Sequence, residues 1–308
     1  MKKEIPTDLK NSWDSINSHS KSFSWATKLF NKKNGTRIAE LYALCRGLDD
    51  IADQDGADNR QKLVNFQTML KKDDMKFDAE MAEFYEKYKH LNLNAGILLQ
   101  LVEGLIEDQS EVAFRTESEL IKYCYKVAGT VGILMCPLLG NKKVAALKFA
   151  VDLGIGMQLT NIARDVKEDA IMNRRYLPGE WVNDISSEKI ILAGRDPDGS
   201  DFKIVQTAIK RTLDLSGKFY TSGLNGLHFL PLRSGLAVGV AASIYQGIGH
   251  KICKNGIKWS SNRVYTRKTE KLWLTLRSMA KMFFKKKHYP QHNDALHSHI
   301  REFENTWV

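Results

Sequence analysis

Apolar residues recur every three or four positions through most of the chain, which is the spacing of helices with one buried face. In the first such segment, residues 12–30, Trp13, Ile16 and Phe23 recur at this spacing. The same pattern predicts further helices at about residues 58–70, 79–89, 95–114, 117–134, 142–170, 202–224, 236–255 and 269–284. No convincing series of strands is found. We therefore expect an all-α fold, a single domain in which long helices surround a central cavity, with a core at about 12–284.

One more helix is expected to carry residues 42–53. The Asn-Gly pair at 34–35 is typical of a turn, and Thr36 is suited to cap the helix that follows. Within the segment 117–134, Gly129 and Gly132 each cost about 1 kcal/mol relative to Ala in a helix. Their missing side chains indicate a close helix crossing, a thin wall beside an apolar ligand, or both.

The polar positions of the 42–53 helix gather on one face. Tyr42, Arg46, Asp49 and Asp53 fall within an arc of roughly 60° at 100° per residue. Two carboxylates one turn apart repel each other unless a cation lies between them. Oxygen ligands without His or Cys suit Mg2+, which leaves room for substrate phosphates.

A second helix repeats this arrangement. Gln158, Asn161, Asp165 and Asp169 are spaced 3, 4 and 4 residues apart and fall within roughly 80°. A single pair of aspartates at this spacing is usually a solvated helix face. Two such faces, each with polar residues in register and apolar stripes beside them, instead predict a cavity containing four aspartates.

The 308 residues carry a formal charge of +10, and the excess is uneven. The segment 249–308 has 13 Lys/Arg and 4 Asp/Glu, a difference of 13 − 4 = +9. No recognised nucleic-acid module accompanies this charge, so nucleic-acid binding is not expected. The segment 281–287 combines Met282, Phe283 and Phe284 with a lysine cluster, which favours attraction to an anionic membrane. A solvated basic helix with Met282 and Phe283 packed inward is the alternative.

The cysteines and histidines do not predict a metal site or disulfides. Cys45, Cys124, Cys136 and Cys253 lie far apart, which fits a reducing cytosol. His288, His292, His297 and His299 lie in a polar C-terminal tail, residues 285–308, which we expect to be mobile. The charged N-terminal residues lack an apolar run behind them, so no signal peptide is expected, and no apolar run reaches the length of a membrane span.

Several sequence blocks, in one order, resemble the squalene/phytoene synthase family of head-to-head prenyl transferases. The resemblance covers about residues 19–269. The blocks are His19-Ser20-Lys21-Ser22-Phe23, residues 42–53, 123–132 and 158–169, Arg175-Tyr176-Leu177-Pro178, Leu230-Pro231-Leu232-Arg233, and Tyr245. Their order and spacing make the match specific in a way that one motif would not.

The resemblance implies an enzyme of the phytoene-forming branch. Two geranylgeranyl diphosphates would condense to prephytoene diphosphate and then to phytoene, with release of diphosphate and with Mg2+ as cofactor, for which Mn2+ is a substitute. No NADPH is expected. The separated cysteines and the basic C-terminal region, rather than the resemblance, predict a cytoplasmic location with peripheral association at the inner membrane face. The sequence does not set the oligomeric state, and a monomer is favoured.

The resemblance also implies roles for individual residues. The catalytic residues would be Asp49, Asp53, Asp165, Asp169, Tyr42, Arg46 and Tyr245. The metal ligands would be Asp49, Asp53, Asn161, Asp165 and Asp169. The substrate-binding residues would be His19, Ser20, Lys21, Ser22, Tyr42, Arg46, Tyr125, Gln158, Asn161, Arg164, Arg175 and Tyr245. Many family members have a Gly-Arg pair where this chain has Arg174-Arg175, and Arg175 is the better match.

Two alternatives remain open at this stage. The first is a squalene or dehydrosqualene synthase that uses farnesyl diphosphate, because pocket depth is not visible in the sequence. The second is a non-catalytic member that serves as an assembly or binding factor. Such proteins usually lose motif acids, and all four aspartates are present here.

Overall fold

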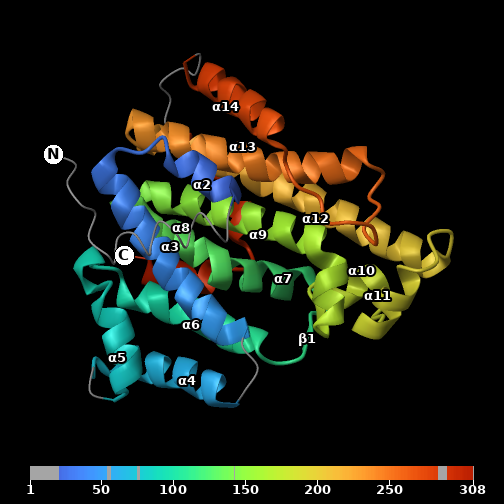
Figure 1. Cartoon of the computed structure of the whole chain (residues 1–308), viewed down its shortest axis with the longest axis horizontal. Coiled ribbons are helices and arrows are strands. Elements are labelled where there is room, and N and C mark those ends of the chain that lie inside the picture. The colour runs from blue at the N-terminus through green and yellow to red at the C-terminus, as the bar shows by residue number, and fades with distance from the viewer. Residues whose placement is uncertain (1–20, 54–56, 75–76, 142, 284–289, 308) are drawn as a thin grey trace.

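The computed structural model describes residues 21–53, 57–74, 77–141, 143–283 and 290–307, and most of these are helical. The one sheet pairs two short parallel strands, β1 (Val112–Ala113) and β2 (Arg174–Arg175). Figure 1 shows helices layered around one long central helix, α9. The expected all-α fold is confirmed.

The longer helices follow the expected order. They are α2 (Lys21–Thr27), α3 (Lys32–Asp53), α4 (Ala57–Lys72), α5 (Ala79–Glu86), α6 (Ala95–Asp108), α7 (Glu117–Cys124), α8 (Thr130–Leu138), α9 (Ala145–Ile171), α12 (Ser200–Asn225), α13 (Leu232–Lys254) and α14 (Lys268–Phe283). Shorter turns of helix connect them: η1 (Lys89–Leu91), the π-helical η2 (Tyr125–Gly129), α10 (Gly179–Val182), α11 (Ser187–Ala193), η3 (Gly226–Phe229), η4 (Asp294–His297) and η5 (Arg301–Thr306).

The start of α3 differs from the sequence prediction. The Asn-Gly pair at 34–35 lies inside the helix, and Thr36 does not cap it. Asn31 acts one turn earlier, because its side-chain oxygen accepts a hydrogen bond from the Asn34 backbone N–H at 2.8 Å. The predicted first helix is shorter too: α2 ends at Thr27, and residues 12–20 lie outside the described part of the chain.

The glycines in and after η2 allow a close crossing with α9. A Cβ atom on Gly132 would lie 2.3 Å from the backbone oxygen of Ala150, and one on Gly154 would lie 2.3 Å from that of Ala128. No side chain fits at such distances, so the two backbones approach only because both residues are glycine. The helix predicted at 117–134 is present without interruption, with the π-helical turn η2 between α7 and α8.

The C-terminal segment, residues 290–307, is packed, which corrects the expectation of a mobile polar tail. Ile300 and His297 are fully buried, and Trp307 is nearly so. The Trp307 Nε1–H donates a hydrogen bond of 2.8 Å to the Tyr125 hydroxyl, and Phe303 stacks on the Tyr125 ring. The few apolar residues of this segment were hard to recognise because they lie between polar ones and are buried only by distant parts of the chain.

Candidate active site

The polar face of α3 carries a guanidinium between carboxylates. Arg46 forms ion pairs with Asp49, at 2.7 Å, and with Asp50 one turn further on. The Nε–H of Arg46 is buried and has no hydrogen-bond partner within the described residues. It is therefore a donor suited to an oxygen atom of a bound ligand.

The facing acids on α9 are held by two arginines. The carboxylate of Asp165 accepts two hydrogen bonds from Arg164, of 2.7 and 2.5 Å, and two of the same lengths from Arg263. Burial would raise the pKa of Asp165, but these bonds outweigh it and hold that pKa below its ordinary value. One turn earlier, the Asn161 amide donates to the Gln158 side-chain oxygen at 3.2 Å.

Asp108, at the end of α6, connects the two faces. Arg174 lies 3.5 Å from Asp108 and 3.5 Å from Asp53, so one guanidinium spans α6 and α3. The Tyr176 hydroxyl donates to Asp108, and the Tyr123 hydroxyl donates to that of Tyr176 at 3.4 Å. Asp108 also raises the pKa of acids on both α3 and α9, which places it near both.

The crowding of these acids perturbs their ionisation. Burial, and then the neighbouring Asp53, raises the pKa of Asp49 to about 6. Burial, and then Asp165 and Asp108, raises the pKa of Asp169 to about 8. The ionised forms are therefore costly in the protein alone, and a bound cation would relieve that cost.

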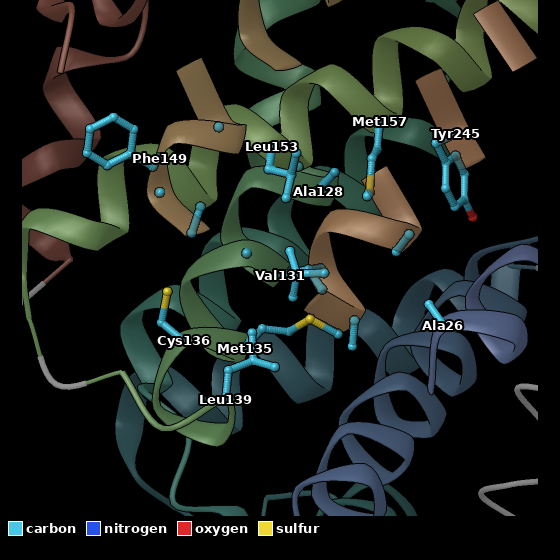
Figure 2. A pocket seen from close by; sticks show the side chains of 18 of the residues that line it. Ala26, Ala128, Val131, Met135, Cys136, Leu139, Phe149, Leu153, Met157 and Tyr245 are labelled. Atoms are coloured by element: carbon cyan, nitrogen blue, oxygen red, sulfur yellow. The ribbon is translucent and has the colours of Figure 1, made fainter. Parts of the chain in front are cut away.

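An apolar cavity of about 270 Å³ opens beside this acidic region. Tyr42, Cys45, Val127, Val131 and Gln158 line both the cavity and the acidic pocket that contains Asp49 and Asp108, so the two spaces adjoin. Figure 2 shows the apolar side chains that line the cavity, with the Tyr245 hydroxyl at one side. Labelled there are Ala128, Val131, Met135, Cys136, Leu139, Phe149, Leu153 and Met157.

The cavity runs beside α9. Near Asn161 its wall includes Tyr42, Gln158 and Tyr245, whereas Ala146 and Phe149 lie at the other end of the helix. Fifteen residues separate Asn161 from Ala146, which is about 22 Å at 1.5 Å per residue. Burial, and then the nearby Tyr245, raises the pKa of Tyr42 to about 12, so this phenol stays protonated at neutral pH.

Two predicted substrate-binding residues point elsewhere. Tyr125 is fully buried, and its hydroxyl donates to Gln100 at 2.5 Å, on the side of the C-terminal segment. The guanidinium of Arg175 is also buried and donates to the backbone oxygens of Phe114, at 2.9 Å, and Leu177, at 3.0 Å.

The remaining predicted residues fall into three groups. Asp53, Arg164, Asp165 and Asp169 line neither the cavity nor the acidic pocket, although Asp165 pairs with Arg164, and Asp53 with Arg174. Tyr42, Arg46, Asp49, Gln158, Asn161 and Tyr245 line the cavity or the adjoining acidic pocket. Lys21 and Ser22 begin α2, whereas the predictions for His19 and Ser20 fall outside the described residues.

Sequence reasoning gave no role to Asp108, Tyr123, Tyr176 and Arg263, and it preferred Arg175 to Arg174. Asp108 lies between Glu107 and Glu111 and is out of step with the four-residue spacing of Glu103, Glu107 and Glu111, so its own position gave no periodic signal. Arg263 lies in an irregular connection between α13 and α14. Only the folded chain brings it to Asp165.

An all-α bundle with aspartate faces on two helices and an apolar cavity between them defines an isoprenoid-synthase-like fold. Among solved structures, a dehydrosqualene synthase in complex with a ligand superposes with a TM-score of 0.72 at 22% identity, covering 90% of this chain and 97% of that one. A squalene synthase from Alicyclobacillus acidocaldarius gives a TM-score of 0.67 at 21% identity, covering 82% of this chain and 97% of that one.

Sequence comparison identifies the family. Residues 16–270 match the squalene/phytoene synthase family. A 15-cis-phytoene synthase of Enterobacter agglomerans is 32% identical over 83% of this chain and 89% of its own. A 4,4'-diapophytoene synthase of Staphylococcus haemolyticus is 30% identical over 80% of this chain and 91% of its own. The chain belongs to the squalene/phytoene synthase family and is a prenyltransferase.

Proposed function

We propose that this enzyme condenses two molecules of geranylgeranyl diphosphate head to head to form phytoene. The proposal rests on one observation: a polar pocket lined by acidic residues lies directly beside a long apolar cavity. An allylic diphosphate has the same two parts, a polyanionic head and an apolar tail. The relatives named phytoene synthase, at about 30% identity over most of the chain, support the C20 substrate.

The acidic side chains of α3 and α9 fit Mg2+. Asp49 and Asp53 on α3 and Asp165 and Asp169 on α9, with Asn161, would provide the oxygen ligands that Mg2+ prefers. The raised pKa values of Asp49 and Asp169 fit a site that is completed by a cation. When bound, Mg2+ would neutralise the diphosphate charge that develops as the allylic C–O bond breaks. Mn2+, which also accepts oxygen ligands, is the expected substitute.

Basic side chains around the pocket would bind the departing diphosphate. Arg46 has its buried Nε–H to offer, and Arg174 lies against Asp53 and Asp108. Arg164 and Arg263 are held on Asp165, from which they can turn to a substrate oxygen. Guanidinium groups at these positions would stabilise the leaving group through paired N–H hydrogen bonds. We propose Arg174, rather than Arg175, for this role.

The apolar cavity would protect the carbocation. In the first half-reaction, one geranylgeranyl diphosphate loses diphosphate, and its cation alkylates the 2,3-double bond of the second molecule. Loss of a proton then gives prephytoene diphosphate. In the second half, this intermediate loses its diphosphate, rearranges and loses a proton to give phytoene. The walls exclude water, which would capture the cation, and the rings of Tyr42 and Tyr245 are placed to stabilise positive charge.

The second candidate function is condensation of the C15 substrate, farnesyl diphosphate. It is favoured by the diapophytoene synthase relative. A product assay separates the two: purified protein and Mg2+ are incubated with labelled C20 or C15 diphosphate, with and without NADPH. Phytoene without NADPH is the expected product. Squalene or dehydrosqualene would establish the C15 function, and no hydrocarbon from folded protein on a lipid surface would favour a non-catalytic member.

We also propose peripheral association with anionic membranes through α14. None of the helices that the structure describes is both long and apolar enough to cross a bilayer. On α14, however, Leu272, Trp273 and Leu276 are each more than half exposed, and this helix lies at the edge of the molecule (Figure 1). The rest of the predicted basic segment, residues 284–287, lies outside the described part of the chain.

Vesicle flotation tests this surface. Vesicles that contain phosphatidylserine should retain the wild-type protein, and phosphatidylcholine vesicles should retain much less of it. Trp273→Glu should abolish retention, whereas Leu192→Glu, at an equally exposed position on α11, should leave it unchanged. Equal loss in both variants would contradict the assignment to α14.

A further inference from the structure

A second cluster of ionisable side chains lies between α9 and the C-terminal segment. The carboxylate of Asp152 accepts a hydrogen bond from Nε2 of His292 at 2.8 Å and from Nε2 of His297 at 2.9 Å. The side chains of Asp152 and His297 are fully buried, and that of His292 is 6% exposed. None of the three belongs to the acidic pocket described above.

The other nitrogen of each imidazole also meets a carboxylate. Nδ1 of His292 lies 3.0 Å from Asp294, and Nδ1 of His297 lies 2.9 Å from Glu304. Lys148 pairs with both of these outer carboxylates, at 2.7 and 3.2 Å. Histidines that bind metal ions typically have this arrangement, in which one nitrogen faces the ion and the other donates to a carboxylate that fixes the ring.

The charges of the cluster are compatible with a divalent cation. In the metal-free arrangement, a proton on each Nε2 atom can be shared with the Asp152 carboxylate. Replacing these two protons with one divalent cation leaves the net charge unchanged. Burial would raise the pKa of Asp152, but the hydrogen bonds from the two histidines outweigh it and lower that pKa. The buried carboxylate therefore already depends on positive charge at this position.

We propose that Asp152, His292 and His297 bind a Zn2+ ion that fastens the C-terminal segment to α9. Their ligand atoms lie within 4.8 Å of one another, so the three side chains can converge on one ion. Two imidazoles and one carboxylate suit Zn2+, whereas Mg2+ prefers oxygen ligands.

The site would also support one end of the substrate cavity. The His292 ring packs edge-on against Phe149, with ring centroids 5.2 Å apart, and Phe149 lines the cavity. Phe149 in turn stacks on Phe229. An ion that holds the His292 ring in place would also hold Phe149 in the cavity wall. The role of the ion is therefore structural rather than catalytic.

Zn2+ binding by the full chain tests the proposal. Protein stripped with a chelator is given Zn2+ in the presence of excess Mg2+, passed through a desalting column, and analysed for bound zinc. We expect one equivalent in the wild type and in His299→Gln, a matched control outside the cluster. His297→Gln and Asp152→Asn should lose it. Asp49→Asn should keep its equivalent of zinc, because Asp49 lies in the acidic pocket and not in this cluster. The zinc measurement therefore does not depend on the proposed function.

A spectroscopic and a stability measurement complete the test. Co2+ in place of Zn2+ should give the visible absorption of a nitrogen-containing, low-coordinate site in the wild type but not in His292→Gln. Zn2+ should raise the thermal unfolding midpoint of the wild type and leave that of folded His292→Gln unchanged, with helical content checked by circular dichroism. Zinc retention by His297→Gln and Asp152→Asn equal to the wild type, or no zinc retained by the wild type, would overturn the proposal.

Discussion

Arg263, in the connection after α13, binds the carboxylate of Asp165 on α9 through two hydrogen bonds of 2.7 and 2.5 Å, across 98 residues of sequence. Arg164, the neighbour of Asp165, binds the same carboxylate. The two guanidinium groups therefore supply the positive charge that a bound metal ion would otherwise supply to Asp165. Substrate and metal would displace one of these groups and leave it free to bind diphosphate.

Replacing Arg263 should therefore impair turnover without unfolding the protein. We expect Arg263→Ala to lower kcat/KM by about 10–1,000-fold, because a fixed donor to the leaving group is lost. Arg263→Lys should recover only part of the loss, since lysine lacks the paired N–H groups. Steady-state kinetics with the C20 diphosphate measures this, and unchanged kcat/KM in Arg263→Ala would exclude the role.

Asp49→Asn and Asp165→Asn test the proposed metal ligands on the two helices. Each substitution removes one negative charge while keeping the side-chain shape. We expect each to abolish measurable turnover and to leave helical content intact. Activity is measured by hydrocarbon product and folding by circular dichroism. Wild-type turnover in either variant would contradict the metal–diphosphate assignment.

The adjacent residues Arg174 and Arg175 should behave oppositely. Arg174→Gln removes a guanidinium from the acidic pocket, so activity should fall steeply while the unfolding midpoint changes little. Arg175→Gln removes a buried group that binds two backbone oxygens, so the free energy of unfolding should fall by about 1–3 kcal/mol. Folded Arg175→Gln should keep its turnover. The reverse pattern would return the substrate role to Arg175.

The stability of the metal-free enzyme should depend on Asp169. Its pKa is raised to about 8 in the folded protein, so its ionisation disfavours the folded state. Protonated Asp169 contributes to the free energy of unfolding at pH values below the ordinary carboxyl pKa. This contribution is lost as the pH rises toward 8 and the carboxyl group ionises. Asp169→Asn should therefore be more stable than the wild type near pH 8, by on the order of 1–3 kcal/mol, and the difference should vanish in acid.

Denaturant unfolding of both proteins with a chelator present measures this difference. Added Mg2+ should stabilise the wild type more than the variant. A difference that grows toward acid pH would contradict the raised pKa.

Cavity length should determine the substrate. Ala150 lies on α9 and lines the cavity, nearer the Ala146 end than the Asn161 end. Ala150→Leu should shorten the usable space and shift the ratio of C20 to C15 turnover toward C15 by roughly 10-fold or more. Ala145→Leu, at an exposed position on the same helix, is the control. An unchanged ratio in Ala150→Leu would show that chain length is chosen elsewhere.

The sequence by itself determined the helical fold and the two aspartate faces. Helical periodicity is local, so residues such as Gln158, Asn161 and Asp165 can be assigned to one face from their spacing alone. The same holds for Tyr42, Arg46 and Asp49 on α3. The order of the sequence blocks matched that of the squalene/phytoene synthase family, and this resemblance connected the two aspartate faces with a prenyl diphosphate reaction.

Only the tertiary structure decided which neighbouring side chain turns toward the site. Arg174 and Arg175 are adjacent and chemically identical, and their opposite directions follow from the short β1–β2 pairing, in which successive side chains alternate. Tyr123 reaches Asp108, whereas Tyr125 reaches the C-terminal Trp307.

The contacts of Arg263 with Asp165, and of His297 with Asp152, join residues 98 and 145 positions apart. Contacts at such separations depend on how helices pack against one another, and no local pattern in the sequence encodes that packing.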